Sequence, residues 1–280
     1  MEPQEVHKNI VIAQPMSRGS FLKRTALLAG GLALSPQLIH GRTSYSKPLT
    51  SSQGLTTDIV YYQGADSYMK CFMARPETSE PLPGLMLIHE NRGLNRHIID
   101  ITKRAAMEGY HVIAPDALSP IGGTLEEFDE NRTSLKKLDP DQTLENFRRG
   151  LAYLQNLTKT TDKTAILGFC WGAGLANQLA VKSKHVDAVV AYYGPQPPIE
   201  AVKDINAPLL LHYAELDDNI NEGVPEFRKA LFNHGIKFRI EMHSGVDHYF
   251  NNPTMGSYNK IAAKKAWKQT FQFLNKHLVT

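Results

Sequence analysis

Short apolar runs alternate along most of the chain with longer segments in which apolar residues recur every three or four positions. The short runs are typical of buried strands, and the longer spacing is typical of amphipathic helices. The strand-like runs are residues 57–63, 68–76, 84–90, 111–116, 164–169, 187–194, 208–215 and 238–245. The helix-like segments are residues 97–110, 139–157, 174–182, 224–235 and a long C-terminal segment. This alternation predicts an α/β domain over residues 57–280.

Several predicted helices show an apolar face or a cap. Three segments each have one apolar face. In residues 97–110 it consists of Ile98, Ile101, Ala105 and Met107, and in residues 139–157 of Leu144, Phe147, Leu151 and Leu154. In the C-terminal segment it consists of Trp267, Phe271, Leu274 and Leu278. Asp139 is a predicted N-cap because Pro140 follows it in the first turn and Gln142 lies three positions after it.

Repeated strand–helix units predict a mostly parallel central sheet of about eight strands, flanked by helices on both faces. In such sheets ligands bind beyond the carboxyl ends of the strands, so the residues after each strand are the candidates for chemistry. Residues 117–139 are polar and contain Gly122 and Gly123, and we predict one long loop there. Loops of that length in compact domains are often lids or binding loops.

The first forty residues differ from the rest and predict an N-terminal extension with an export signal. Arg18, Lys23 and Arg24 precede an apolar run of Leu, Ala and Gly, which is the layout of such signals. The stretch resembles a twin-arginine signal, with Gly19 where the second arginine is expected. The prediction is export to the periplasm without stable membrane insertion after processing, or a cytoplasmic protein if Gly19 disables the signal.

Other interpretations of this region stay open. An amphipathic helix docked on the domain would show the same basic flank and apolar run. Translation could start at Met1 or at Met16. Residues 41–56 are polar and rich in Ser and Thr, so they are predicted to be a linker.

The composition of the chain makes some classes of function less favoured than others. The 31 Lys and Arg residues nearly balance 28 Asp and Glu residues, which argues against nucleic acid as a partner. The two cysteines, Cys71 and Cys170, give no disulfide framework and no metal-binding spacing, and we expect two free thiols. Neither a metal-binding nor a nucleotide-binding motif is present, so no metal and no cofactor are predicted. The sequence leaves the oligomeric state open.

Residues 168–172 read Gly-Phe-Cys-Trp-Gly and join a predicted strand to a predicted helix. This G-x-C-x-G pattern is that of a nucleophile elbow with sulfur in place of oxygen. Glycines two positions before and after the nucleophile avoid clashes in the tight turn. A helix N-terminus also stabilises a thiolate. The pattern favours Cys170 as a nucleophile over the alternative, a buried core cysteine.

The elbow predicts an acid and then a histidine further along the chain. Asp217 follows the predicted strand 208–215, and His248 follows the strand 238–245. The acid would orient the imidazole so that it accepts a proton. A surface-loop histidine and a turn aspartate are the alternatives. His212 and His243 lie within strand runs and are expected to be core residues.

Four motifs together resemble the dienelactone hydrolase family of α/β-hydrolases: G-x-C-x-G, "ELDD", "DHYF" and "IHENRGL". The resemblance covers about residues 57–280. It implies hydrolysis of a small-molecule ester or lactone through a thioester, with Cys170 as nucleophile, Asp217 as triad acid and His248 as base.

The resemblance also implies roles for residues around the triad. Glu90 would handle the thiol proton as the substrate arrives, and the backbone N–H groups of Asn91 and Trp171 would form the oxyanion hole. The family has a carboxylate-binding arginine shortly after the histidine, and this chain has Asn252 there. Arg132, in the long loop, is a candidate for the second such arginine.

Two further residues are candidates for contact with the substrate. Arg92 either pairs with Glu90 or meets a substrate carboxylate. Tyr249 belongs to a set of aromatic residues predicted to wall an apolar pocket: Phe169, Trp171, Tyr192, Tyr193, Tyr249 and Phe250. A non-catalytic ligand-binding protein of the same fold and a thiol-dependent acyltransferase are the alternative functions.

Overall fold

The computed structural model describes residues 16–17, 54–126 and 128–279. Most of the predicted extension, export signal and linker lies outside these residues, so those assignments stay predictions. Within the described residues, no helix has the length and apolar character needed to cross a membrane.

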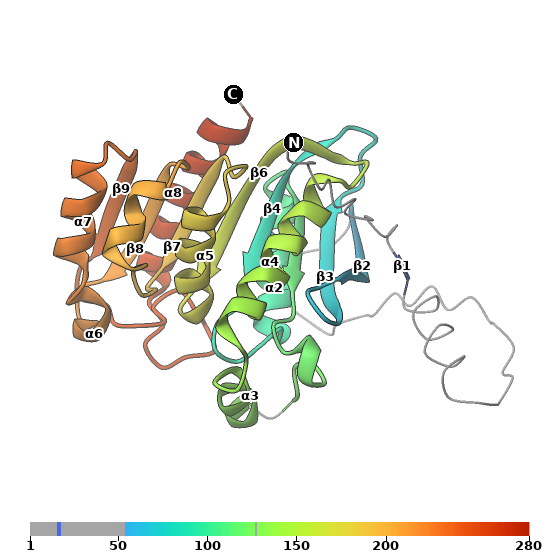
Figure 1. Cartoon of the computed structure of the whole chain (residues 1–280), viewed down its shortest axis with the longest axis horizontal. Helices are drawn as coiled ribbons and strands as arrows, with labels where there is room; N and C mark the ends of the chain where they lie inside the picture. The colour runs from blue at the N-terminus through green and yellow to red at the C-terminus, as the bar shows by residue number, and fades with distance from the viewer. Residues whose placement is uncertain (1–15, 18–53, 127, 280) are drawn as a thin grey trace, which may run out of the picture.

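One mixed sheet runs through the domain (Figure 1). In spatial order its strands are β1 (Met16–Ser17), β2 (Leu55–Gln63), β3 (Tyr68–Pro76), β5 (His111–Pro115), β4 (Leu82–Ile88), β6 (Thr160–Phe169), β7 (Ala188–Tyr192), β8 (Leu209–Ala214) and β9 (Phe238–His243). β1 to β3 form antiparallel pairs, as do β3 and β5, and the other neighbours are parallel. Apart from the two-residue β1, these strands confirm the predicted, mostly parallel sheet of about eight strands.

Helices cover both faces of the sheet. The larger ones are α4 (Pro140–Gln155), α5 (Trp171–Lys182) and α7 (Val224–Asn233) on one face, and α2 (Arg96–Met107) and α8 (Lys260–Leu278) on the other. In β4, Met86 and Ile88 pack into the first core and Leu85 and Leu87 into the second. Because both faces are buried, the parallel strands are apolar at nearly every position.

The helix faces follow the sequence with one exception. Asp139 caps α4 by accepting a hydrogen bond from the Gln142 N–H at 2.7 Å. Ile98 and Ile101 are buried as predicted, but Met107 is 46% exposed because it is the last residue of α2. That part of the prediction was wrong.

Residues 117–139 are not one loop, which corrects the prediction. They contain the short helices η1 (Ser119–Ile121) and α3 (Phe128–Leu135). Buried Asn131 anchors α3, since its amide donates to the Leu125 carbonyl at 2.8 Å and accepts the Leu125 N–H at 2.9 Å. Propensity and apolar spacing do not reveal such a tertiary anchor, because the helix carries no regular apolar face.

Candidate active site

Cys170 is the single residue between β6 and α5, and its backbone is in the left-handed region with φ 52°. A Cβ atom at Gly168 would lie 2.3 Å from the Gly172 carbonyl oxygen, and one at Gly172 would lie 2.4 Å from the His89 carbonyl oxygen. The two glycines therefore permit the close approach that raises Cys170 to the carboxyl edge of the sheet.

We expect Gly172→Ala to lower the free energy of unfolding by about 3 kcal/mol, because the added methyl group overlaps backbone atoms that cannot move aside easily. Urea unfolding followed by circular dichroism measures the change. Gly256→Ala is the matched control, since a Cβ atom there meets nothing within 4 Å. Equal stability of the two variants would contradict this account of the elbow.

Three elements bring a thiol, an imidazole and a carboxylate together. The Cys170 Sγ lies 3.1 Å from the His248 Nε2. The other ring nitrogen, Nδ1, lies 2.5 Å from the Asp217 Oδ2. Asp217 follows β8 and is 7% exposed, and His248 lies in the turn after β9. The order along the chain and the geometry are those of an acid that orients a base toward a nucleophile.

The environment of the sulfur favours the neutral thiol. Burial raises the pKa of Cys170 to about 11, and the negative charges of Glu90 and Asp217 act in the same direction. Hydrogen bonding with the Tyr249 hydroxyl and with the Trp171 N–H lowers the pKa and so acts in the opposite direction. A thiol with this pKa needs a base at hydrogen-bond distance, and His248 is placed there.

Glu90 is 1% exposed and lies just beyond the end of β4. The Tyr193 hydroxyl donates to its Oε1 at 3.0 Å, and the Asn252 amide donates to its Oε2 at 2.6 Å. Burial raises the pKa of Glu90 to about 7, although these two hydrogen bonds and the charge of Arg92 lower it. The carboxyl group is therefore held in a state that gains or loses a proton near neutral pH.

Asn252 occupies the position where the family resemblance leads one to expect an arginine, and its side chain is committed to Glu90. Its Oδ1 accepts hydrogen bonds from the Thr254 N–H at 2.9 Å and the Thr254 hydroxyl at 2.7 Å. These bonds fix the orientation of the amide, so that its Nδ2 faces the carboxylate. No local sequence pattern indicates this contact.

Cys170, His248, Asn91 and Trp171 line one cavity of about 300 Å³. The remaining lining residues are Arg132, Leu135, Lys136, Tyr193, Pro195 and Ile220. For the backbone N–H groups of Asn91 and Trp171, no backbone acceptor is found among the described residues. The Trp171 N–H acts on the Cys170 sulfur, and both residues line the cavity.

The structure sorts the predicted substrate residues. Arg132 lines the cavity. Arg92 does not line it, and the positive charge of Arg92 lowers the pKa of Glu90. Tyr249 lies beside the sulfur, with its hydroxyl 3.5 Å from Cys170 Sγ. Lys136, which sequence reasoning missed, also lines the cavity. Its only sequence indication was its place in the long polar segment.

The predicted aromatic wall is only partly correct. Phe169, Tyr192 and Phe250 are at most 1% exposed and pack in the core, and Trp171 and Tyr193 line the cavity. Phe169 and Tyr192 are the last residues of β6 and β7 and pack in one core cluster, so only part of the predicted set reaches the cavity.

The histidines predicted to be core residues are buried. His212 Nδ1 lies 3.0 Å from His243 Nε2. Cys71 is also buried, and both cysteines are free thiols. In the described part of the chain, no three His, Cys, Asp or Glu side chains are grouped so that they could hold a metal ion.

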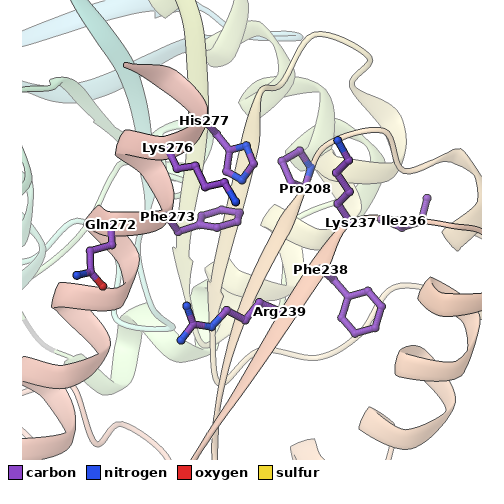
Figure 2. A pocket seen from close by; sticks show the side chains of 9 residues that line it. All are labelled: Pro208, Ile236, Lys237, Phe238, Arg239, Gln272, Phe273, Lys276 and His277. Atoms are coloured by element: carbon purple, nitrogen blue, oxygen red, sulfur yellow. The ribbon is translucent and has the colours of Figure 1, made fainter. Parts of the chain in front are cut away.

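A larger groove, of about 620 Å³, lies elsewhere on the molecule, at the start of β9 and the end of α8 (Figure 2). Its lining combines apolar and basic side chains: Pro208, Ile236, Lys237, Phe238, Arg239, Gln272, Phe273, Lys276 and His277. It contains no thiol, and its one histidine has no carboxylate among the lining residues. The volume of a groove therefore does not identify the active site. The thiol, imidazole and carboxylate that lie together at Cys170 identify it.

The sequence pattern that defines the dienelactone hydrolase family matches residues 69–278. The chain belongs to this family. A protein of Saccharolobus solfataricus named "Putative carboxymethylenebutenolidase" is 29% identical over 78% of this chain and 97% of its own length. A protein of the same name from Escherichia coli K12 is 28% identical over 83% of this chain and 93% of its own length.

Solved structures agree on the fold of this dienelactone hydrolase family member. A Klebsiella pneumoniae structure described as "Putative Dienelactone Hydrolase" superposes with a TM-score of 0.74 at 24% identity, covering 79% of this chain and 99% of the other. Family membership confirms the α/β-hydrolase fold and the class of enzyme, a hydrolase of carboxylic esters or lactones.

Proposed function

We propose that this enzyme hydrolyses its ester or lactone substrate through a covalent thioester on Cys170, with His248 and Asp217 as the base and the orienting acid. The observation that carries the proposal is the continuous contact from Cys170 Sγ through the imidazole to Asp217, with distances of 3.1 Å and 2.5 Å. A cavity opens onto the sulfur and would hold the acyl group.

In the first half of the reaction, the thiol proton moves to His248 Nε2 and the sulfur attacks the carbonyl carbon. The carbonyl oxygen becomes an oxyanion, held by the N–H groups of Asn91 and Trp171; such donors are each worth about 3 kcal/mol in comparable sites. The carbon–oxygen bond then breaks, and the alkoxide takes the proton from His248. A thioester on Cys170 remains.

In the second half, His248 removes a proton from water, and the hydroxide oxygen attacks the thioester carbonyl. The same two N–H groups hold the second oxyanion. The carbon–sulfur bond breaks, the sulfur leaves as a thiolate and takes the proton back, and the carboxylic acid is released. Asp217 keeps the imidazole in the tautomer and orientation that both halves need.

Glu90 would be the alternative acceptor of the thiol proton, taking it in place of His248 when the substrate arrives and returning it afterwards. A pKa near 7 suits a group that exchanges a proton at neutral pH. Its two partners support both protonation states: in the neutral acid, a proton on Oε1 would point to the Tyr193 oxygen, and Asn252 would keep donating to Oε2.

We expect Glu90→Gln to raise the free energy of unfolding at pH 8 by roughly 3 kcal/mol while lowering activity. The pKa of Glu90 is higher in the folded protein, about 7 against 4.5, so the stability that its proton provides is complete below pH 4.5 and lost as pH rises through 7. Glutamine avoids this loss because it stays neutral.

Urea unfolding at pH 5 and pH 8 tests this, with the exposed Glu77→Gln as the control. The difference between Glu90→Gln and the unchanged protein should be larger at pH 8. A difference that is the same at both pH values would show that burial does not shift the titration of Glu90.

The cavity favours a substrate with an anionic group. Arg132 and Lys136 contribute positive charge to a lining that otherwise includes Leu135, Pro195 and Ile220. These two cations come from α3 and the residue after it, while Asn252 is occupied by Glu90. We propose that they hold the anionic group, and that Arg92 acts on Glu90 instead.

A trapping experiment tests the proposed function. The full chain is mixed with p-nitrophenyl acetate, quenched in acid, digested and examined by mass spectrometry. The expected result is an acetyl group on Cys170 that hydroxylamine removes. Hydrolysis with no acyl group on Cys170 would overturn the thioester mechanism. Transfer of the acyl group to added alcohol in preference to water would indicate an acyltransferase, and absence of turnover a binding protein.

A further inference from the structure

Tyr249 has an unusual backbone for an aromatic residue. Among the described non-glycine residues, positive φ values occur at Cys170, Tyr193 and Tyr249, and that of Tyr249 is 64°. Side chains with a Cβ atom rarely adopt this region, and residues held there cluster at functional sites. The turn is held by the Asn252 N–H, which donates to the Tyr249 carbonyl at 2.8 Å. The strained turn places the phenol hydroxyl beside the sulfur.

The hydroxyl of Tyr249 touches two groups of the site. The Asn91 amide donates to it at 2.9 Å, and the neutral Cys170 thiol donates to it at 3.5 Å. A phenol hydroxyl has one proton to donate. With a lone pair already occupied by Asn91, that proton is left for the sulfur whenever the sulfur is a thiolate.

We propose that Tyr249 is a catalytic residue that donates a hydrogen bond to the Cys170 thiolate, from the side not occupied by His248. The proposal rests on the proposed function in taking Cys170 as the nucleophile. When the thiol proton moves to His248, the sulfur becomes a pure acceptor and receives the Tyr249 O–H. The same bond would stabilise the thiolate that leaves when the thioester is hydrolysed.

The charges around the sulfur explain why such a donor is needed. The negative charge of Asp217, and that of Glu90 when it is ionised, disfavours a thiolate. Tyr193 is committed to Glu90. The Trp171 N–H faces the sulfur but is also a proposed oxyanion donor. Tyr249 would remain on the sulfur while Trp171 serves the oxyanion.

Tyr249 is suited to donate and not to accept the proton. Burial and the nearby thiol raise its pKa far above neutral, so the phenol keeps its proton throughout turnover. Its ring stands nearly perpendicular to the His248 imidazole, at a centroid distance of 4.3 Å. A phenylalanine would keep that ring contact, so Tyr249→Phe removes the hydroxyl alone.

The test measures the pH dependence of Cys170 alkylation by iodoacetamide in the full chain, read by mass spectrometry of the Cys170 peptide. In Tyr249→Phe we expect the apparent thiol pKa to rise by about one unit, and alkylation at pH 7 to slow about tenfold. We expect kcat/KM for p-nitrophenyl acetate to fall about tenfold, mainly through kcat. Tyr192→Phe is the matched control, since its buried hydroxyl bonds to Thr270 and it does not line the cavity.

Replacing Tyr249 by a fluorinated tyrosine gives an independent measurement with the opposite sign. Its more acidic hydroxyl is a stronger donor, so the thiol pKa should fall. An alkylation profile unchanged in both variants would overturn the proposal, as would a shift of equal size in Tyr192→Phe. Alkylation needs no ester turnover, so this outcome is distinct from failure of the hydrolase mechanism, which the acyl-trapping experiment reports.

Discussion

Cys170→Ala is expected to lower kcat/KM for p-nitrophenyl esters by about 10⁴- to 10⁶-fold, the range seen when an enzyme loses its nucleophile. The sulfur is the atom that forms and breaks the covalent bond. Among the described residues, no other nucleophilic side chain lies within hydrogen-bond distance of the His248 imidazole. The oxyanion donors and the cavity remain, so a small acceleration over water should survive. Initial rates of ester hydrolysis measure the effect, at an enzyme concentration high enough for the residual rate to exceed the rate without enzyme.

Cys71→Ala is the matched control for Cys170→Ala. Cys71 is fully buried in β3, and the pKa of its thiol is raised by burial, so it makes no contribution to turnover in the proposed mechanism. Its replacement should leave kcat/KM within about twofold and change only stability, by an amount typical of a small cavity. Equal losses in the two variants would point to damage of the fold, and a fully active Cys170→Ala would remove the thioester mechanism.

Much of this site could be predicted because its chemistry depends on backbone geometry. The Gly168 and Gly172 pattern predicts the elbow, since larger side chains would collide there. The chain order then indicates Asp217 and His248, because both follow parallel strands whose carboxyl ends meet at one edge of the sheet. These expectations need no knowledge of side-chain packing.

The parts that could not be predicted depend on tertiary contacts. The Asn252 amide reaches Glu90 across 162 positions of sequence, and the Asn91 amide reaches Tyr249 across 158. The helix α3, which brings Arg132 into the cavity, has no apolar face of its own and depends on the buried Asn131. The local sequence pattern does not indicate these contacts, so the charges and hydrogen bonds around the site can be described only from the folded structure.

His248→Gln is expected to lower kcat/KM at pH 7 by about 10³- to 10⁴-fold, and to make activity depend steeply on pH. With the pKa of Cys170 at about 11, only about one molecule in 10⁴ carries a thiolate at pH 7 once the base is absent. Each unit of pH then produces tenfold more thiolate. The logarithm of kcat/KM should therefore rise with a slope near one from pH 7 to pH 10, as it would not in the unchanged enzyme.

The measurement is the rate of nitrophenyl ester hydrolysis between pH 6 and pH 10, with the double variant His248→Gln, Cys170→Ala as the blank at each pH. The exposed His234→Gln, at the end of α7, is the control for loss of a histidine. A flat pH profile in His248→Gln would mean that another group accepts the thiol proton. Glu90, with its pKa near 7, would then be the base, and the imidazole would serve only the second half of the reaction.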